Sequence, residues 1–270
     1  MDKIAIVTFT LANRLHLIVN CINSVKSQLG DLLITHYIWY KDEEVKAYLD
    51  EHVQEQDNIV LVKYSDLELK HTQQKMAVLR NMAITNIEEK YVGFLDDDNE
   101  YNSIHIQSLL NVINEKGYSA AHSLRYLVYP DNTLYDGSFY PWHYDKNTTN
   151  DVYDWCIKNN ILKLNSPIMF DRYVEEDNIF NVATVDMNEW LFKTSMIKEV
   201  KFNEAFSEDE IKRLVGEDGK ILESIIKNNI PYGTTNLPTV KYCLGGFSNY
   251  FSLNEDSRFC NHNKVNYEAT

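Results

Sequence analysis

Residues 91–99 read YVGFLDDDN, an apolar run that ends on three consecutive aspartates. Adjacent carboxylates repel one another and each resists removal from water, so a buried strand does not normally end in this way. The commonest agent that compensates such charge is a divalent cation with oxygen ligands. Asp96 and Asp98 point to the same side if the chain stays extended, because side chains alternate along a strand. The stretch therefore predicts a strand that delivers two carboxylates to a site for Mg²⁺ or Mn²⁺ and phosphate, with a solvated turn as the alternative.

Composition limits the class of protein and its partners. The chain has 270 residues, of which 44% are hydrophobic and 24% charged, and this suits one globular domain or two closely joined subdomains. The net charge of −14, without a basic stripe, argues against nucleic acid or an anionic membrane as the main partner. No apolar run reaches the about 18 residues of a transmembrane helix, and the N-terminus reads as a strand, not a signal peptide. Four cysteines without metal-ligand spacing complete the expectation of a reduced, cytoplasmic protein: Cys21, Cys156, Cys243 and Cys260.

Residues 1–115 alternate between strand and helix patterns. In 15–28, for example, apolar residues recur at spacings of three and four, as they do on one face of a helix. We expect strands at 3–9, 32–40, 58–64 and 91–95, and helices at 15–28, 43–55, 76–84 (after a polar opening at 71–75) and 104–115. This alternation predicts a mostly parallel sheet with helices on both faces. Ligands of such sheets bind at the carboxyl ends of the strands, where the TLANR loop (10–14) and the aspartate turn both lie.

The second half of the chain has a different pattern. Residues 122–142 predict two strands around a Pro-Asp-Asn turn, whereas 145–180 read as polar, aromatic and irregular. A strand that runs into a short helix is expected at 185–197, and a helix that starts at Gly216-Glu217-Asp218 is expected within 202–230. The remainder of the chain reads as loop-rich.

Five segments, in order along the chain, resemble motifs of the family 2, GT-A type glycosyltransferases, which transfer a sugar from a nucleotide-sugar donor. They are TFTLANR (8–14), CINSVKSQ (21–28), AVLRNMAI (77–84), YVGFLDDDNEY (91–101) and GEDGKIL (216–222). The resemblance implies an α/β fold of GT-A type, with a Rossmann-like, mostly parallel sheet and a smaller acceptor-binding half. It divides the domain into a donor-binding half, 1–117, and an acceptor-binding half with the catalytic base, 118–270. One departure concerns the acidic D-D-G-S after the second strand: here 38–44 read IWYKDEE, so Asp42 is the nearest acidic residue and the nucleotide base stays open.

The resemblance also implies roles for the acidic residues. Asp98 would bind a Mn²⁺ or Mg²⁺ ion that bridges the two phosphates, and Asp96 would bond to the ribose or nucleoside, with Asp97 in the same substrate-binding turn. Asp218 is the candidate general base: a helix start lowers its proton affinity, whereas burial and Glu217 raise it. One base opposite a metal-held leaving group predicts direct displacement with inversion. The alternative is that Glu217-Asp218 only caps a helix.

Further candidates surround these carboxylates. Thr8, Phe9 and Arg14 flank the exit of the first strand and are expected to line the nucleotide pocket, with a core position as the alternative for Phe9. Arg80 could bind a phosphate or form a structural ion pair. His262 is a candidate third metal ligand, or an exposed histidine near the C-terminus. Stacking on the acceptor, with a core position as the alternative, is a candidate role for three tryptophans: Trp142, Trp155 and Trp190.

The predicted function is transfer of a sugar from a nucleoside-diphosphate sugar to a hydroxyl group of a glycan or glycolipid by metal-assisted, inverting displacement. Peripheral association with a membrane is compatible with a glycolipid acceptor, and the oligomeric state stays open. A non-catalytic nucleotide-sugar or glycan binding module is an alternative that could dispense with Asp218. A metal-dependent nucleotidyltransferase would need a glycine-rich phosphate loop, and TLANR has no glycine. A dehalogenase-type phosphatase would need Thr or Val where Glu100 stands, and a calcium loop would need glycine where Tyr101 stands.

Overall fold

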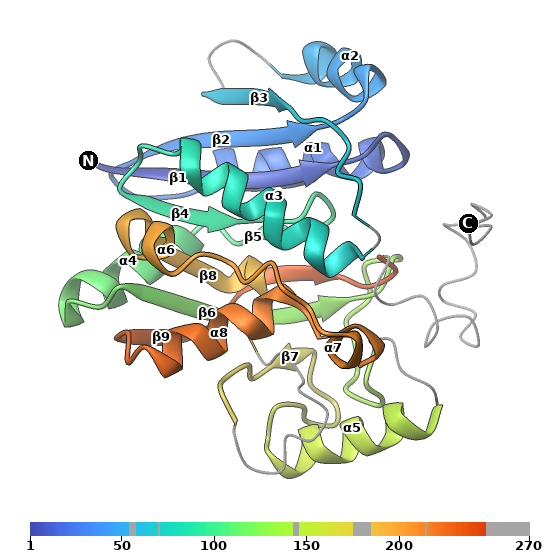
Figure 1. Cartoon of the computed structure of the whole chain (residues 1–270). Coiled ribbons are helices and arrows are strands. Elements are labelled where there is room, and N and C mark those ends of the chain that lie inside the picture. Colours follow the sequence, from blue (N-terminus) through green and yellow to red (C-terminus); the bar gives the residue numbers. More distant parts are fainter. Residues whose placement is uncertain (54–57, 70, 143–145, 175–184, 214, 247–270) are drawn as a thin grey trace.

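The computed structural model describes residues 1–53, 58–69, 71–142, 146–174, 185–213 and 215–246 (Figure 1). Its first half alternates strands with helices. The elements are β1 (Asp2–Thr10), η1 (Ala12–Arg14), α1 (Leu15–Lys26), β2 (Leu32–Tyr40), α2 (Glu43–His52), β3 (Ile59–Lys63), α3 (Thr72–Asn86) and β4 (Tyr91–Phe94). β1 pairs in parallel with β2 and β4, and β2 pairs in parallel with β3. The predicted alternation is confirmed here, and the carboxyl ends of four parallel strands meet at one edge of the sheet.

The second half adds strands to the same sheet. Its elements are β5 (Glu100–Tyr101), α4 (His105–Lys116), β6 (Ala120–Val128), α5 (Lys146–Lys158), β7 (Ile168–Met169), η3 (Met187–Glu189), β8 (Trp190–Lys193), α6 (Thr194–Val200), α7 (Glu208–Lys212), α8 (Glu217–Lys227) and β9 (Tyr232–Cys243). Within the described residues nine strands form one sheet in the order β3-β2-β1-β4-β8-β6-β9-β5, with β7 beside β6. β8 runs antiparallel to β4 and β6, whereas β6 and β9 are parallel. The two predicted halves therefore share a continuous sheet.

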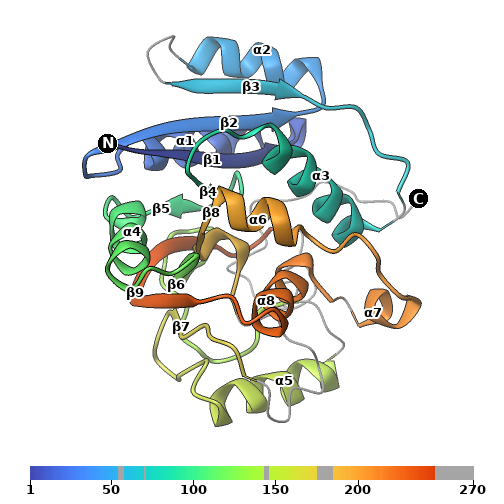
Figure 2. The ribbon, with the colours of Figure 1, turned by 60° about the vertical axis from the view of Figure 1, so that its left-hand side comes forward.

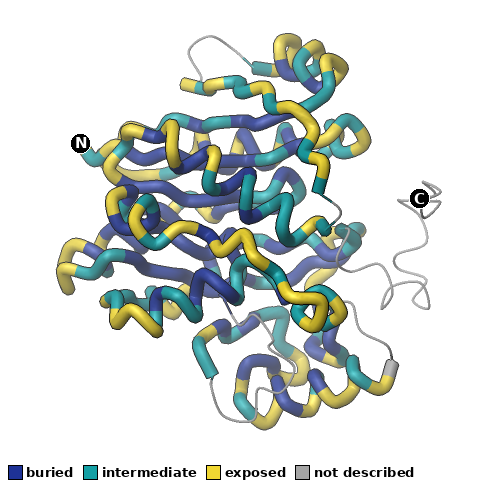
Figure 3. The backbone as a smooth tube through the Cα atoms, viewed as in Figure 1, coloured by how far each residue is buried: buried dark blue, intermediate teal, exposed yellow. Residues whose placement is uncertain are grey.

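Helices cover both faces of the sheet, because apolar side chains of the central strands point alternately to either side. Ile4 and Ile6 pack with α1, α2 and α4, whereas Ala5 and Val7 pack with α3, α6 and α8. Figure 1 shows α3, α6 and α8 in front of the sheet and α1 behind it. Figure 3 shows that the central strands are buried along most of their length, whereas the helices alternate between buried and exposed residues. Among the described helices, none combines the length and apolar character that crossing a membrane requires.

A third apolar cluster lies below the sheet and contains α5. Val152, Trp155 and Cys156 form the buried face of this helix, and they pack against Leu127 and Tyr242 from the ends of β6 and β9. Figures 1 and 2 both place α5 and β7 at the end of the molecule opposite to α2. This cluster packs α5 against the carboxyl ends of β6 and β9.

Three expectations for the second half are wrong. Residues 145–180 are not irregular throughout, because α5 and β7 lie within them; α5 has only a short apolar face among polar residues, which hid its period. The loop-rich end contains the 12-residue strand β9, whose signal is interrupted by Pro238 and by Asn236 with φ +54°. The Pro130-Asp131-Asn132 turn forms, since the Asn132 amide donates to the Tyr129 carbonyl at 2.8 Å, but its second strand is reduced to a single bridge at Leu134.

Trp190 connects the two halves and is a core residue, not an acceptor-stacking one. It is 0% exposed and its ring stacks on Phe192 at 5.2 Å. We predict that Trp190→Ala lowers the free energy of unfolding by about 3–5 kcal/mol, because it leaves a large cavity between α8 and the sheet. Urea denaturation followed by circular dichroism measures this change. As a control, Leu164→Ala at a 63% exposed position should stay within about 0.5 kcal/mol of wild type. A loss below about 1 kcal/mol for Trp190→Ala would contradict its place in the core.

Candidate functional site

The aspartate turn leaves the end of β4 at the middle of the sheet, and main-chain and side-chain hydrogen bonds hold both its ends. The Leu95 amide donates to the Val7 carbonyl at 3.0 Å, which extends the pairing of β4 with β1. At the other end, the Asn99 side chain accepts from the Cys243 amide of β9 at 2.9 Å. The chain turns between these anchors, so the carboxylates of 96–98 are placed by the sheet and not by a free loop.

Arg14 is the cation of this turn. It ends η1, immediately after β1, and its guanidinium lies 2.8 Å from Asp97 Oδ1 and also contacts Asp98 Oδ2. The Asp97 and Asp98 side chains are only 2% and 12% exposed, and Arg14 is 26% exposed. Burial raises the pKa of both carboxyls, Arg14 opposes the rise, and Asp96 adds to it. One guanidinium thus faces more negative charge than it can neutralise.

Asp186 and Asn188 extend the site from η3, and neither was among the residues predicted from the sequence. The Asn188 side chain accepts from the Asp96 amide at 2.6 Å and donates to Asp96 Oδ2 at 2.9 Å. Asp186 caps η3 by accepting from the Asn188 amide at 3.0 Å. Because β8 is antiparallel to β4, the residues that precede β8 lie beside the end of β4. A signal in the sequence that could have found them is that polar residues directly precede an apolar strand, here WLFK.

The start of α8 brings the second pair of predicted acidic residues to the site. Glu217 forms an ion pair with Arg80, whose guanidinium lies 5.4 and 5.7 Å from the ring centroids of Phe94 and Phe202. Of the two roles predicted for Arg80, a phosphate contact or a structural ion pair, this arrangement corresponds to the ion pair. It also ties the first helical turn of α8 to α3.

Asp218 follows Glu217 at the start of α8, and its Oδ1 accepts from the Gly219 amide at 2.7 Å. A Cβ atom at residue 216 would lie 2.3 Å from the same oxygen, so glycine there leaves room for the carboxylate. Burial raises the pKa of Asp218 to about 7, with Glu217 and Asp186 adding to the rise and Arg80 opposing it. Asp186 also adds to the rise in the pKa of Asp98.

The remaining predicted residues divide between the sheet edge and the interior. Phe9 is half-buried with its ring 5.9 Å from Trp39, which in turn lies 6.4 Å from Tyr64, so aromatic rings follow the carboxyl ends of β1, β2 and β3. Asp42 precedes α2 at the same edge. Thr8, in contrast, is fully buried and its hydroxyl lies 2.9 Å from His36 Nε2, which favours a structural role over contact with a nucleotide. Two of the tryptophan candidates, Trp155 and Trp190, are core residues, and Trp142 is half-buried.

The donor chemistry of the turn suits a hard divalent cation, because all the acidic ligands there are carboxylate oxygens that one arginine leaves under-compensated. His262 lies outside the described residues. Within the part of the chain that the structure describes, no three His, Cys, Asp or Glu side chains converge on a point that could hold a metal ion. Any ion at Asp98 would therefore need oxygens from a bound phosphate or water to complete its coordination.

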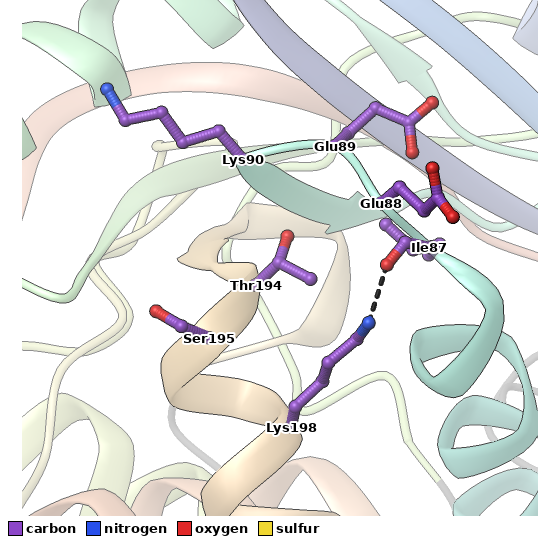
Figure 4. A pocket seen from close by; sticks show the side chains of 7 residues that line it. All are labelled: Ile87, Glu88, Glu89, Lys90, Thr194, Ser195 and Lys198. Carbon is purple, nitrogen blue, oxygen red and sulfur yellow. Dashed lines mark hydrogen bonds between the residues drawn. The ribbon is translucent and has the colours of Figure 1, made fainter.

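A separate hollow lies at the opposite edge of the sheet (Figure 4). It has a volume of about 350 Å³ and is lined by Ile87, Glu88, Glu89, Lys90, Thr194, Ser195 and Lys198. The Lys198 ammonium donates to the Ile87 carbonyl across it at 2.6 Å. It lies where β4 begins, whereas the acidic turn lies where β4 ends, so the two are different places in the fold.

Comparison with known proteins gives a family and a fold. A family model described as "Glycosyl transferase family 2" matches residues 5–165. No curated protein matches the chain. Among solved structures, TarS 1-349 of S. aureus superposes with a TM-score of 0.53 at 14% identity over 89% of this chain and 60% of that chain. The complex of TarS 1-349 with UDP-GlcNAc matches with a TM-score of 0.53 at 14% identity, over 90% of this chain and 58% of that chain. A longer TarS structure matches with a TM-score of 0.51 at 13% identity, over 90% of this chain and 37% of that chain. The chain thus spans less than two thirds of the TarS chains that it matches.

Removal of the Arg14 charge tests the electrostatics of the turn. We predict that Arg14→Gln lowers the free energy of unfolding at pH 7.5 by about 2–3 kcal/mol, less than the about 3–5 kcal/mol of a fully buried pair because Arg14 is partly exposed. The loss should shrink at about pH 5, since the two carboxyls have raised pKa values and can take up protons there. Urea denaturation at both pH values measures this. Lys46→Gln, which removes an exposed ion pair with Asp50, is the control and should leave the stability unchanged at both pH values. An equal loss at both pH values would speak against charge as the cause.

Proposed function

Because the chain belongs to glycosyl transferase family 2, we propose that it transfers a sugar from a nucleoside-diphosphate sugar to a hydroxyl group of a carbohydrate or glycolipid acceptor. The predicted family and the GT-A type α/β fold are both confirmed. The observation that carries the proposal is the meeting of two acidic groups at one sheet edge: the turn after β4 and the start of α8. Arg80 connects the two places, because it pairs with Glu217 and its guanidinium lies 5.4 Å from the ring centroid of Phe94 at the end of β4. One group can hold the leaving diphosphate and the other can accept a proton.

The donor would lie along the carboxyl ends of the first three strands. Phe9, which is half-buried at the end of β1, offers a ring face on which a nucleobase can stack. Asp42, at the start of α2, is the nearest carboxylate to recognise a base, and Asp96 would accept from ribose hydroxyls. TarS was crystallised with UDP and with UDP-GlcNAc, so uridine donors are the first to test.

Asp98 would hold the divalent cation, Mn²⁺ or Mg²⁺, together with the phosphates of the donor. When bound, such an ion supplies Lewis-acid stabilisation of the departing diphosphate. Arg14 contributes a second positive charge at the same point, because its guanidinium already contacts Asp98. Asp97 is the most buried of the three aspartates and pairs with Arg14, so it orients that guanidinium.

Asp218 would act as the general base. Its carboxylate takes the proton of the acceptor hydroxyl as the hydroxyl oxygen bonds to the anomeric carbon, and the bond from that carbon to the diphosphate oxygen breaks. A single base on the face opposite the leaving group yields inversion. A pKa of about 7 leaves a substantial fraction of the carboxylate ionised at neutral pH while keeping it a stronger proton acceptor than an ordinary aspartate. Arg80 keeps Glu217, and with it the start of α8, in place.

Two substitutions separate the roles of the acidic groups. Asp218→Asn should lower kcat by about 10²–10⁴-fold with little change in donor KM, because it removes only the base. Asp98→Ala should raise the donor KM as well as lower kcat. Release of nucleoside diphosphate from UDP- and GDP-sugars with Mn²⁺ and an acceptor panel measures both. Glu223→Gln, an exposed carboxylate further along α8, is the control and should keep full activity. A wild-type protein that binds a donor with metal but turns over with no acceptor would favour a non-catalytic binding module instead.

The pH profile of turnover follows from the pKa of Asp218. Only the ionised carboxylate can accept the proton, so kcat should rise about tenfold per pH unit below about pH 7 and level off above it. Stopped assays at saturating donor between about pH 5 and 9 measure this profile. The residual rate of Asp218→Asn should lack the rise, whereas Glu223→Gln should keep it. A profile that falls with pH over this range would exclude Asp218 as the base.

A further inference from the structure

The Asn188 amide makes a two-point contact with Asp96. Its carbonyl oxygen accepts from the Asp96 main-chain amide, and one hydrogen of its NH₂ group donates to Asp96 Oδ2. The other hydrogen donates to Asp186 Oδ1 at 2.5 Å. Asn188 is 1% exposed, so water does not compete for these bonds.

The orientation of this amide is determined by its partners. A flipped amide would place its carbonyl oxygen against two carboxylates and its NH₂ group against the Asp96 N–H, which would replace each attraction with a repulsion. A carboxylate at residue 188 would likewise lose both donors. A neutral residue with one acceptor and two donors is therefore required between the two acidic groups.

Arg125 holds the other side of this arrangement. It is a buried residue of β6 that donates to Asp186 Oδ2 at 2.5 Å, and its Nε lies 2.9 Å from Asp171. Its guanidinium carbon is 4.6 Å from the ring centroid of Trp142 and 4.9 Å from that of Tyr242. A guanidinium enclosed by two rings and three carboxylates, those of Asp171, Asp186 and Glu189, has little freedom to move. Arg125 thus fixes one oxygen of Asp186, and the other oxygen accepts from Asn188.

We propose that Asn188, held by Asp186 and Arg125, is a positioning residue that fixes Asp96 and the acidic turn for the nucleotide of the donor. The contacts form a continuous connection from β6 through η3 to the end of β4. This inference rests on the proposed function for its ligand, a nucleoside diphosphate. Its structural part, that Asn188 fixes the turn, does not depend on that function.

Hydrogen exchange and nucleotide binding test the two parts separately. The variants are Asn188→Ala, which removes all the side-chain bonds, and Asn188→Asp, which keeps the acceptor but places a third carboxylate beside Asp96 and Asp186. The matched control is Gln28→Ala, because the side-chain amide of Gln28 also forms hydrogen bonds with a distant main-chain segment. It accepts from the Ile106 amide at 3.0 Å and donates to the Asn102 carbonyl at 2.8 Å. Exchange is followed in peptides that cover 95–99, and calorimetry measures the affinity for UDP or GDP, whichever the wild type binds.

We expect exchange of the Asp96 amide to rise about fivefold or more in Asn188→Ala, as the loss of one ordinary hydrogen bond implies. Nucleotide affinity should fall about tenfold or more, and further in Asn188→Asp, whereas kcat at saturating donor should change by less than about threefold. Gln28→Ala should leave the turn and the affinity unchanged.

Three results would overturn the inference. Unchanged exchange at 95–99 in Asn188→Ala would show that other contacts fix the turn. Faster exchange with unchanged nucleotide affinity would show that the fixed turn does not matter for the donor. Faster exchange throughout the protein would assign Asn188 a general structural role. If the wild type binds no nucleoside diphosphate, the proposed function fails, and exchange at the turn alone then decides whether Asn188 fixes it.

Discussion

Burial of negative charge at the carboxyl edge of the sheet is the constraint on which the site depends. Carboxylates from the turn after β4, from η3 and from the start of α8 share one region, and burial together with neighbouring carboxylates raises the pKa of Asp98, Glu217 and Asp218. Three arginines from different elements compensate them. Arg14 pairs with the turn, Arg80 with Glu217, and Arg125 with Asp186. Each arginine also joins two elements that are far apart in sequence, so the same ion pairs that permit the charge also position it.

The fold of the first half could be predicted because its signals are local. Strand and helix periods alternate with short turns from residue 3 to residue 116, and right-handed crossovers leave few arrangements for such a pattern. The second half was predicted less well. The period of α5 rests on few apolar residues, and β9 is stabilised by pairing with β6 over most of its length despite Pro238 and Asn236. Tertiary pairing thus overrides weak local preference there.

The candidate site follows the same division. Asp96, Asp98 and Asp218 lie in contiguous motifs and were predicted from the sequence, because the residues next to them mark the end of a strand or the start of a helix. Arg125 and Asn188 were not found, because their importance arises from contacts across 61 and 92 residues. A lone arginine within an apolar strand has no local partner in the sequence, and only the antiparallel placement of β8 brings one to it. The role of Thr8 differs from expectation for a related reason, since His36, on the adjacent strand, occupies its hydroxyl.

The position of β8 has a mechanical consequence. Main-chain hydrogen bonds join β8 to β4 on one side and to β6 on the other, so the strands of the first half and those of the second half belong to a single hydrogen-bonded layer. A hinge between the two sides would have to break this pairing, whereas hinges in proteins act at loops or at the ends of elements. Movement of one side relative to the other is therefore restricted to the loops that border the sheet edge. The sheet itself serves as a stiff frame that keeps the aspartate turn and the start of α8 at a constant distance.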